Sequence, residues 1–164
     1  MRYAILAMAL CIGGCGSLLA ETLDEQVVRL LDEGKYAEAE PLALQAIEVS
    51  LKKNGPDHPD TAASLNNLAL LYYTQAKYDL AEPLYERALA IYEKALGPDH
   101  PDTATSLNNL ALLYYTQAKH DLAEPLYERA LAICEKALGP DHPNTIQFRE
   151  NLAQMKADRE AAGK

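Results

Sequence analysis

The sequence predicts an all-α solenoid, a stack of antiparallel helical hairpins built from one repeated unit. The main observation is internal repetition: residues 55–96 and 97–138 differ at only three of 42 positions. A fixed period of this length is typical of stacked-repeat proteins. Two further observations make helices the repeating element. Apolar residues recur with helical spacing in each half of the unit, and Gly-Pro pairs separate the copies.

The first 20 residues differ from the rest of the chain. Arg2 is the only charged residue before Glu21, and residues 3–20 carry no charge, a pattern that predicts an export leader. The segment IGGC resembles a bacterial lipobox, which makes Cys15 a predicted lipidation site. Two alternatives stay open: cleavage after Ala20, or retention of residues 3–20 as a membrane anchor at the lower length limit of a bilayer span.

All three forms of the leader place the repeats outside the cytoplasm. We therefore expect a periplasmic protein or an outer-membrane lipoprotein that faces the periplasm. With residues 3–20 retained, we expect an inner-membrane anchor instead. In each case the protein contacts the membrane only through its leader or lipid.

The charge balance excludes one class of partner. The chain has 15 Lys and Arg against 24 Asp and Glu, a net charge of −9. Nucleic-acid binding requires clustered basic residues, and the sequence has no basic stripe, so we expect no nucleic-acid partner. Cys134 is the one cysteine after the leader, and we predict that it is a buried, small apolar residue.

We divide the chain into a leader, a repeat domain and a short tail. These cover residues 1–20, 21–161 and 162–164. The domain contains three hairpin units and a capping helix, at residues 21–54, 55–96, 97–138 and 143–161.

Each complete unit contains two amphipathic helices joined by a short turn. In the second unit, the apolar residues at i, i+3, i+4 and i+7 of the first helix are Leu65, Leu68, Ala69 and Tyr72. The second helix has the same spacing, at Ala81, Leu84, Tyr85, Ala88, Leu89 and Tyr92. Only residues 74–77 separate the two stripes, so the helices must be antiparallel neighbours.

Glycine and proline mark the unit boundaries. Gly97 can take the left-handed conformation that ends a helix, and Pro98 prevents its continuation. Pro101 suits the first turn of the next helix, where a missing N–H costs nothing. Pro83 lies inside a second helix. With Asp79 as the predicted N-cap, it removes only the first intrahelical bond and bends the helix slightly.

The two helices of a unit differ in charge. Residues 61–76 and 103–118 contain no charged side chain, whereas the second helix of the same unit carries Asp79, Glu82, Glu86, Arg87, Glu93 and Lys94. In a stack of hairpins, one helix faces solvent on the convex side and the other, flanked by neighbours, lines the concave side. We predict that the uncharged first helices line the concave side.

Three strings, LNNLALLY, AEPLYERALAI and LGPDHPDTA, resemble the tetratricopeptide repeat (TPR), and closely the long variety found in kinesin light chains and bacterial relatives. The resemblance covers residues 22–155. The spaced positions of the pattern fall on Leu65, Leu68, Ala69, Tyr72, Tyr78, Ala81, Tyr85 and Ala88, and on Leu107, Leu110, Ala111, Tyr114, His120, Ala123, Tyr127 and Ala130. The resemblance implies a right-handed α-solenoid that acts as a non-catalytic protein–protein interaction scaffold.

Both ends of the array depart from the pattern. The first helix of the first unit has Asp24 and Glu25 where the next unit has Asn66 and Asn67, so we do not expect it to line a groove in the same way. Residues 143–161 begin as a further first helix, become charged and lack a second helix. Arrays need polar outer ends, so both ends are predicted caps, which leaves about three repeats plus a closing helix.

The resemblance places partner binding on the inner side of the first helices. The candidate residues are Asn66, Asn67, Leu70, Tyr73, Thr74, Asn108, Asn109, Leu112, Tyr115, Thr116 and Asn151. In TPR domains that bind extended peptides, an Asn at the Asn67 position contacts the ligand backbone, which implies a ladder of Asn67, Asn109 and Asn151. A side-chain amide can both donate and accept. The alternative role for these amides, bonding neighbouring repeats, stays open.

These residues predict the binding of an extended, weakly charged peptide or a partner helix. The inner helices have no Lys or Arg to capture a C-terminal carboxylate. The alternative function is a self-assembling structural scaffold, or an accessory subunit of an envelope or secretion complex. Weak self-association would then occur through end-to-end stacking of near-identical units.

Other site chemistries are not expected. The repeated Asp-His-Pro-Asp motif, with His58 in its first copy, places each His in a separate loop, whereas zinc needs three or four ligands around one point. We predict loop capping for these residues, and no metal or cofactor. The sequence has no phosphate loop, HExxH motif or nucleophile elbow, so we assign no catalytic residue.

Overall fold

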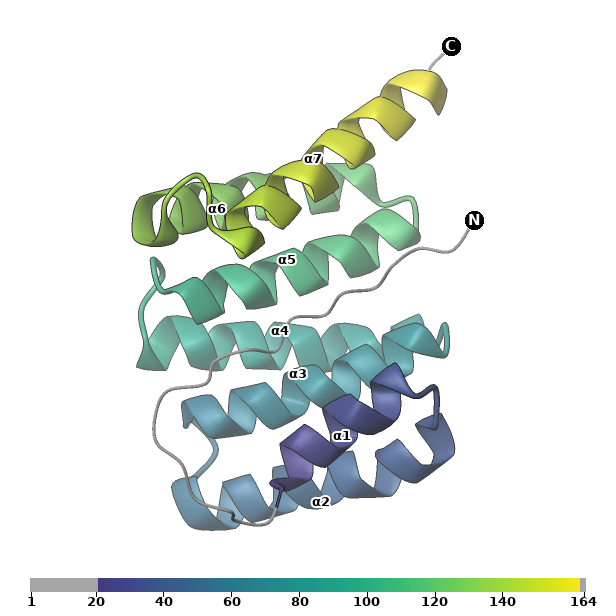
Figure 1. Cartoon of the computed structure of the whole chain (residues 1–164), viewed down its shortest axis with the longest axis vertical. Helices are drawn as coiled ribbons and strands as arrows, with labels where there is room; N and C mark the ends of the chain where they lie inside the picture. Colours follow the sequence, from purple (N-terminus) through teal and green to yellow (C-terminus); the bar gives the residue numbers. More distant parts are fainter. Residues whose placement is uncertain (1–20, 163–164) are drawn as a thin grey trace.

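The computed structural model describes residues 21–162, which form seven α-helices and no strand. The helices are α1 (Leu23–Asp32), α2 (Tyr36–Asn54), α3 (Pro59–Thr74), α4 (Tyr78–Ala95), α5 (Pro101–Thr116), α6 (His120–Leu138) and α7 (Pro143–Ala162). They stack in chain order, with α1 and α2 at one end and α7 at the other (Figure 1). The predicted all-α solenoid of about three hairpins and a final helix is confirmed.

The predicted leader, with its lipidation site at Cys15, lies outside the described residues. Among the helices that are described, none is long and apolar enough to span a bilayer.

The hairpins stack by packing the second helix of one unit against the first helix of the next, α2 on α3, α4 on α5 and α6 on α7. α3 packs along α4 within its own hairpin, and its backbone also approaches α1 and α5. The backbone of α5 likewise approaches α7. Over residues 21–162, the second helices α2, α4 and α6 do not approach one another in this way. The first helices are therefore the ones flanked by neighbours on both sides.

The apolar core is continuous between units. The Tyr85 and Tyr127 side chains are 1% and 0% exposed, and they lie in one cluster with Ala111 of α5 and Met155 of α7. Each buried tyrosine removes about 150–250 Å² from water, so these rings contribute much of the packing between hairpins. Cys134 is fully buried, as predicted, among residues of α5, α6 and α7.

The loop between units is fixed by three kinds of residue. Gly55 has φ 92° and ψ 173°, and it ends α2. Pro59 is the first residue of α3, and His58 is its N-cap: the His58 Nδ1 accepts a hydrogen bond from the Asp60 N–H at 3.2 Å. The Thr61 hydroxyl donates to the Gly55 carbonyl at 2.8 Å. The same capping bond recurs in the next two loops, so the predicted capping role of the motif is confirmed.

The start of α4 differs from the prediction. Its N-cap is Lys77, which makes no side-chain capping bond, so the prediction that Asp79 caps this helix is wrong. Ala76 takes a positive φ of 57°, which turns the chain back early enough for the helix to begin at Tyr78. Pro83 therefore lies in the second turn and removes the bond to the Asp79 carbonyl, yet α4 continues to its end at Ala95.

Replacing Gly55 by Ala should lower the free energy of unfolding by about 1–3 kcal/mol, because only glycine adopts this backbone conformation without strain. A Cβ at this position would meet no atom within 4 Å, so the change isolates backbone strain. Ala76→Gly should be neutral or stabilising, since it relieves roughly 1 kcal/mol of left-handed strain. Urea unfolding of both variants measures the two effects. Equal stability of Gly55→Ala and the parent would contradict the strain argument.

Candidate functional site

The predicted partner-binding residues lie on α3, α5 and α7. We call the surface they form the first-helix face. It consists of Asn66, Asn67, Leu70, Tyr73, Thr74, Asn108, Asn109, Leu112, Tyr115, Thr116 and Asn151. Asn108 is buried, Thr116 is exposed, and the others are half-buried. The face is therefore part of the packing between units as well as a surface that a partner can reach.

Side-chain hydrogen bonds cross the first-helix face between successive first helices. The Asn67 amide donates to the Asp24 carboxylate at 2.8 Å, and the Asn151 amide donates to the Asn108 carbonyl oxygen at 3.0 Å. At these two junctions the ladder amides bond neighbouring repeats. Asp24 occupies the position of Asn66 in the preceding unit, and its carboxylate is the acceptor here and also receives a bond from the Ser64 hydroxyl.

The equivalent pair at the middle junction is not bonded. Asn66 and Asn109 make no side-chain hydrogen bond to residues 21–162, and the Asn66 Oδ1 is buried without a partner. A buried acceptor left unpaired costs about 1–3 kcal/mol. Of the three predicted ladder residues, Asn109 alone keeps a free amide within the described chain. The half-buried Asn109 amide can therefore both donate to a ligand and accept from it, whereas the Asn66 Oδ1 is closed to solvent.

A second row of bonds crosses the face two turns further along the helices. The Tyr73 hydroxyl lies 3.0 Å from the Thr116 hydroxyl. Thr116 donates its own proton to the Leu112 carbonyl, so Tyr73 is the donor of the pair. Burial raises the Tyr73 pKa, which keeps this hydroxyl protonated. Tyr115 makes the equivalent bond to the Asp158 carboxylate.

The charges on the first-helix face lie at its ends. Asp24 of α1 and Asp158 of α7 each accept a hydrogen bond from it, while α3 and α5 contribute no charge after their first turns. The second helices carry ion pairs away from this face, as between Arg129 of α6 and Glu93 of α4 at 2.6 Å. The middle of the face is therefore suited to a neutral segment of a partner.

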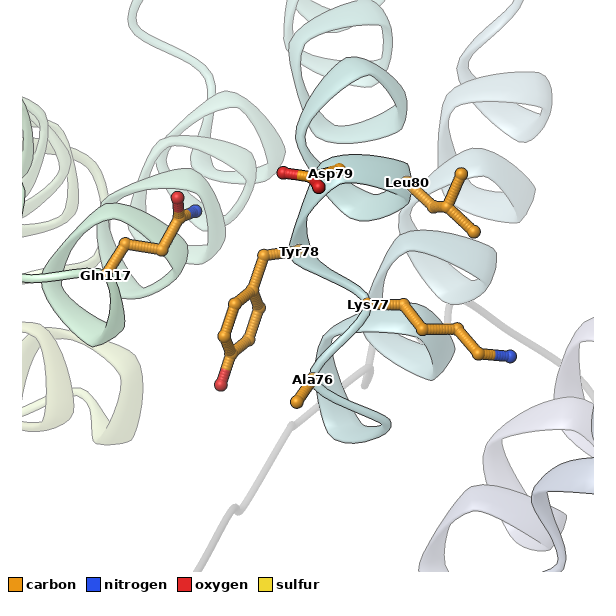
Figure 2. A pocket seen from close by; sticks show the side chains of 6 residues that line it. All are labelled: Ala76, Lys77, Tyr78, Asp79, Leu80 and Gln117. Carbon is orange, nitrogen blue, oxygen red and sulfur yellow. The ribbon is translucent and has the colours of Figure 1, made fainter.

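A cavity of about 380 Å³ opens between the α3–α4 turn and the end of α5 (Figure 2). Its lining residues are Ala76, Lys77, Tyr78, Asp79, Leu80 and Gln117. It adjoins the first-helix face, because the rings of Tyr78 and Tyr73 lie 5.9 Å apart. The Asp79 carboxylate and the Gln117 amide are on the same side in Figure 2, whereas Lys77 and Leu80 point the other way. Sequence reasoning missed this cavity, because no motif marks it.

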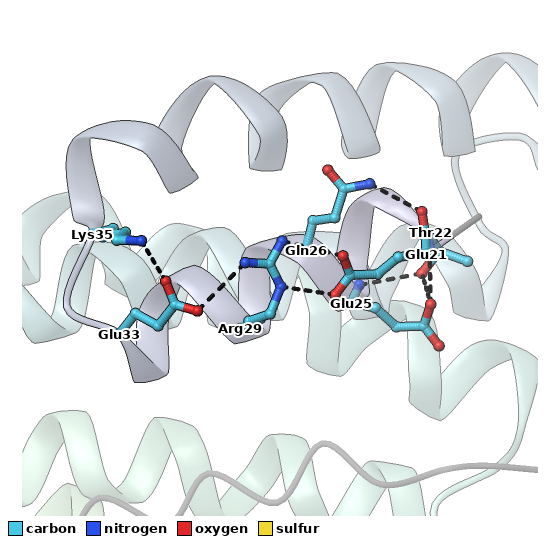
Figure 3. A network of polar contacts seen from close by, with 7 residues as sticks. All are labelled: Glu21, Thr22, Glu25, Gln26, Arg29, Glu33 and Lys35. Carbon is cyan, nitrogen blue, oxygen red and sulfur yellow. Dashed lines mark hydrogen bonds and ion pairs between the residues drawn. The ribbon is translucent and has the colours of Figure 1, made fainter.

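The N-terminal end of the array is covered by a polar network (Figure 3). Arg29 pairs with Glu21 at 3.0 Å and with Glu33 at 3.4 Å. Thr22 and Glu25 form a capping box at the start of α1, in which each side chain accepts from the backbone N–H of the other. This network makes the outer surface of the first hairpin polar, as a terminal unit requires.

The C-terminal end is also charged, but its charges are bound to α6. The Arg159 guanidinium lies 3.0 Å from Asp121 and 2.7 Å from Glu124, and Lys156 lies 2.8 Å from Glu128. The sequence predicts only that the charged half of α7 makes this end of the array polar. These ion pairs also hold α7 against α6 of the last complete hairpin.

Neither a metal centre nor a reactive thiol is found at these positions. No group of three or more His, Cys, Asp or Glu side chains within residues 21–162 is arranged to hold a metal ion. Cys134 is a free thiol whose burial raises its pKa to about 11. Because the thiolate is the reactive form, this side chain is inert near neutral pH.

Comparison with known proteins identifies similar repeats. Three overlapping segments, residues 28–94, 75–136 and 116–161, match the family described as Tetratricopeptide repeat. Two crystal structures of a Podosopora anserina protein, described as a kinesin light chain with nearly identical TPR-like repeats, are 29% identical to this chain. Their TM-scores are 0.73 and 0.74, and the match covers 81% of this chain and 63% of theirs.

The crystal structure of BtubC (BKLC) from P. vanneervenii is also similar. It is 27% identical with a TM-score of 0.75, over 86% of this chain and 55% of that one. The chain thus spans less than two thirds of the length of these structures. No curated protein matches the sequence.

Cys134 should resist alkylation in the folded protein. At pH 8, iodoacetamide should label it slowly, because the side chain is fully buried and its pKa is about 11. In urea the same thiol should react as an ordinary cysteine, whose pKa is about 8.5. Mass spectrometry of the peptide that contains Cys134 follows both rates. Fast labelling of the native protein would show that the thiol is accessible.

Proposed function

The chain belongs to the tetratricopeptide repeat family, whose members are protein–protein interaction scaffolds, and we propose that it binds an extended, weakly charged peptide segment of a partner protein along its first-helix face. The family and its kinesin-light-chain-like neighbours are typically non-catalytic. Binding is therefore the activity for which the first-helix face is best suited.

The unbonded pair at the middle junction is the observation that carries this proposal. Asn109 has a free amide, and the buried Asn66 Oδ1 lacks a donor. A peptide unit supplies one N–H donor and one carbonyl acceptor, which match the carbonyl oxygen and the NH2 group of the Asn109 side chain whatever the peptide side chain. Leu70 and Leu112 lie one turn further along α3 and α5, and both are half-buried. They offer apolar contact beside the polar pair.

The chemistry of the first-helix face favours an internal peptide segment over a C-terminus. A C-terminal carboxylate needs a cationic partner, and α3 and α5 have no Lys or Arg. Bonding at the other two junctions also limits the ligand site. Asn67 and Asn151 already donate hydrogen bonds within the protein. Asn109 is therefore the ladder residue whose amide is left to contact a ligand.

We also propose that the protein is exported, as a periplasmic protein or a lipoprotein. The support is the sequence pattern of residues 1–20, with one early basic residue and a lipobox-like IGGC segment.

Expression in a bacterial host tests this localisation. The N-terminal peptide from the envelope fraction should carry a lipid on Cys15, and Cys15→Ala should remove that mass. The same peptide also reports the alternatives: cleavage after Ala20 indicates a signal peptide, and retention in the membrane indicates an anchor. An unprocessed chain in the cytosol would contradict export.

Site-specific cross-linking tests the proposed binding face. We expect p-benzoylphenylalanine in place of Leu112 to capture a defined partner, whereas the same residue in place of the exposed Ala132 of α6 should not. Adding Asn109→Ala should reduce the captured partner about tenfold, since it removes hydrogen bonds to the ligand. Identical capture from both positions would place the binding surface elsewhere.

Matched variants separate ligand binding from folding. Asn109→Ala should leave the melting temperature unchanged, because its amide has no bond within residues 21–162. Asn67→Ala should lower the free energy of unfolding by about 1 kcal/mol through loss of the Asp24 bond. A destabilised Asn109→Ala protein would mean that this residue supports the fold rather than a ligand.

A further inference from the structure

Three junctions join successive units, and equivalent residues surround the same site at each of them. This site lies between the turn of one hairpin and the C-terminal end of the first helix in the following unit. At the N-terminal junction, Ala37 of α2 stands where the later units have Asp79 and Asp121. Glu40, the counterpart of Glu82, accepts a hydrogen bond from the Tyr72 hydroxyl at 3.2 Å. The facing Gln75 amide donates to the Leu71 carbonyl of its own helix at 3.2 Å. This junction has no unpaired polar group to offer.

The C-terminal junction has the same site occupied by a guanidinium. Here the first turn of α6 contributes Asp121, and Arg159 stands where the earlier copies have glutamine. The Arg159 guanidinium lies 3.0 Å from Asp121 and 2.7 Å from Glu124. The protein therefore binds a guanidinium at this site with its own side chain.

The middle junction has the same acidic residues without the arginine. Asp79 and Glu82 are the counterparts of Asp121 and Glu124, but the residue opposite is Gln117. Its Nε2 is buried and has no partner, and both Asp79 and Gln117 line the 380 Å³ cavity (Figure 2).

Nearby cations do not neutralise Asp79. The Lys77 ammonium lies 5.5 Å from the centre of the Tyr72 ring, and the Lys119 ammonium lies 3.3 Å from Glu82. Asp79 itself has no ion pair or hydrogen bond through its side chain to residues 21–162. The cavity therefore has an unpaired carboxylate in a protein of net charge −9.

We propose that this cavity binds an arginine side chain of a partner protein, in the position that Arg159 occupies one unit further along. Asp79 accepts from the guanidinium, and the ring of Tyr78, which replaces His120 of the next copy, provides a surface on which its plane can stack. The planar, forked guanidinium fits a carboxylate beside an aromatic ring better than an ammonium does.

This site adds a side-chain preference to the proposed function but does not depend on it. The cavity adjoins the first-helix face through Tyr78 and Tyr73, so a peptide at Asn109 can extend into it. A probe with a single side chain reports the cavity alone. Failure at the cavity is thus distinguishable from failure of peptide binding along the first-helix face.

The test is an NMR titration of the full chain with N-acetyl-arginine methylamide. We expect saturable shift changes at the amides of Tyr78, Asp79 and Gln117, with a dissociation constant on the order of millimolar for one exposed ion pair. The citrulline analogue, which is neutral, should cause no such shifts, and the lysine analogue should bind more weakly. Free arginine that binds more tightly than the blocked form would indicate a metabolite site and overturn the assignment to a protein partner.

Variants at equivalent positions of two junctions make the test specific. Asp79→Asn should weaken binding about tenfold, whereas Asp121→Asn should not change it, because that site is already filled by Arg159. Gln117→Arg should abolish binding by filling the cavity from within. Arg159→Gln should create a second site, with new shifts near Asp121. Unchanged binding in both Asp79→Asn and Gln117→Arg, or equal binding of lysine and arginine, would overturn the proposal.

Discussion

The side chains of the first helices are buried only when other helices pack on several sides of them, and the stacking of the units depends on this burial. α5 packs on α6 within its own hairpin, and its backbone also approaches α3 and α7. Leu113 and Ala111 of this helix are both 0% exposed. A single hairpin cannot provide such burial, so units are stable only as a stack. α7 provides this burial for the third hairpin, because its Phe148 and Met155 pack against that hairpin.

Position in the stack gives near-identical residues different surroundings. Asn109 and Asn151 occupy the same position of the unit, yet Asn151 bonds Asn108 and Asn109 is unbonded. Similarly, Asp121 is paired with Arg159, and its counterpart Asp79 is unpaired. At the outer junctions, residues of α1 and α7 take part in these bonds: Asp24 accepts from Asn67, Asn151 donates to Asn108, and Arg159 pairs with Asp121. The middle junction lies between two complete units, and there the side chains of Asn109 and Asp79 have no bond within residues 21–162.

The two proposed contacts therefore belong to one region. The Asn66–Asn109 pair and the cavity at Asp79 both lie between the second and third units, and Tyr73 and Tyr78 connect them. The helices around this region are held by buried side chains and by bonds such as Tyr73 to Thr116. A partner would thus meet groups that are already fixed in position, which lowers the entropy lost on binding.

Repetition and helical periodicity are enough to predict the repeat, the helices and most of the core. Apolar spacing identified Leu65, Ala69, Tyr85 and Ala88, and all four are buried, because helical periodicity depends only on neighbours along the chain. Which polar groups are free depends on contacts between units, which no local pattern predicts. The inter-unit bonds of Asn67, Tyr73 and Asn151 join residues 43 positions apart. The Asp79 site depends on the residue that the next unit places opposite it. A local pattern gives the face on which Asn109 lies. Whether its amide is already bonded depends on where its unit stands in the stack.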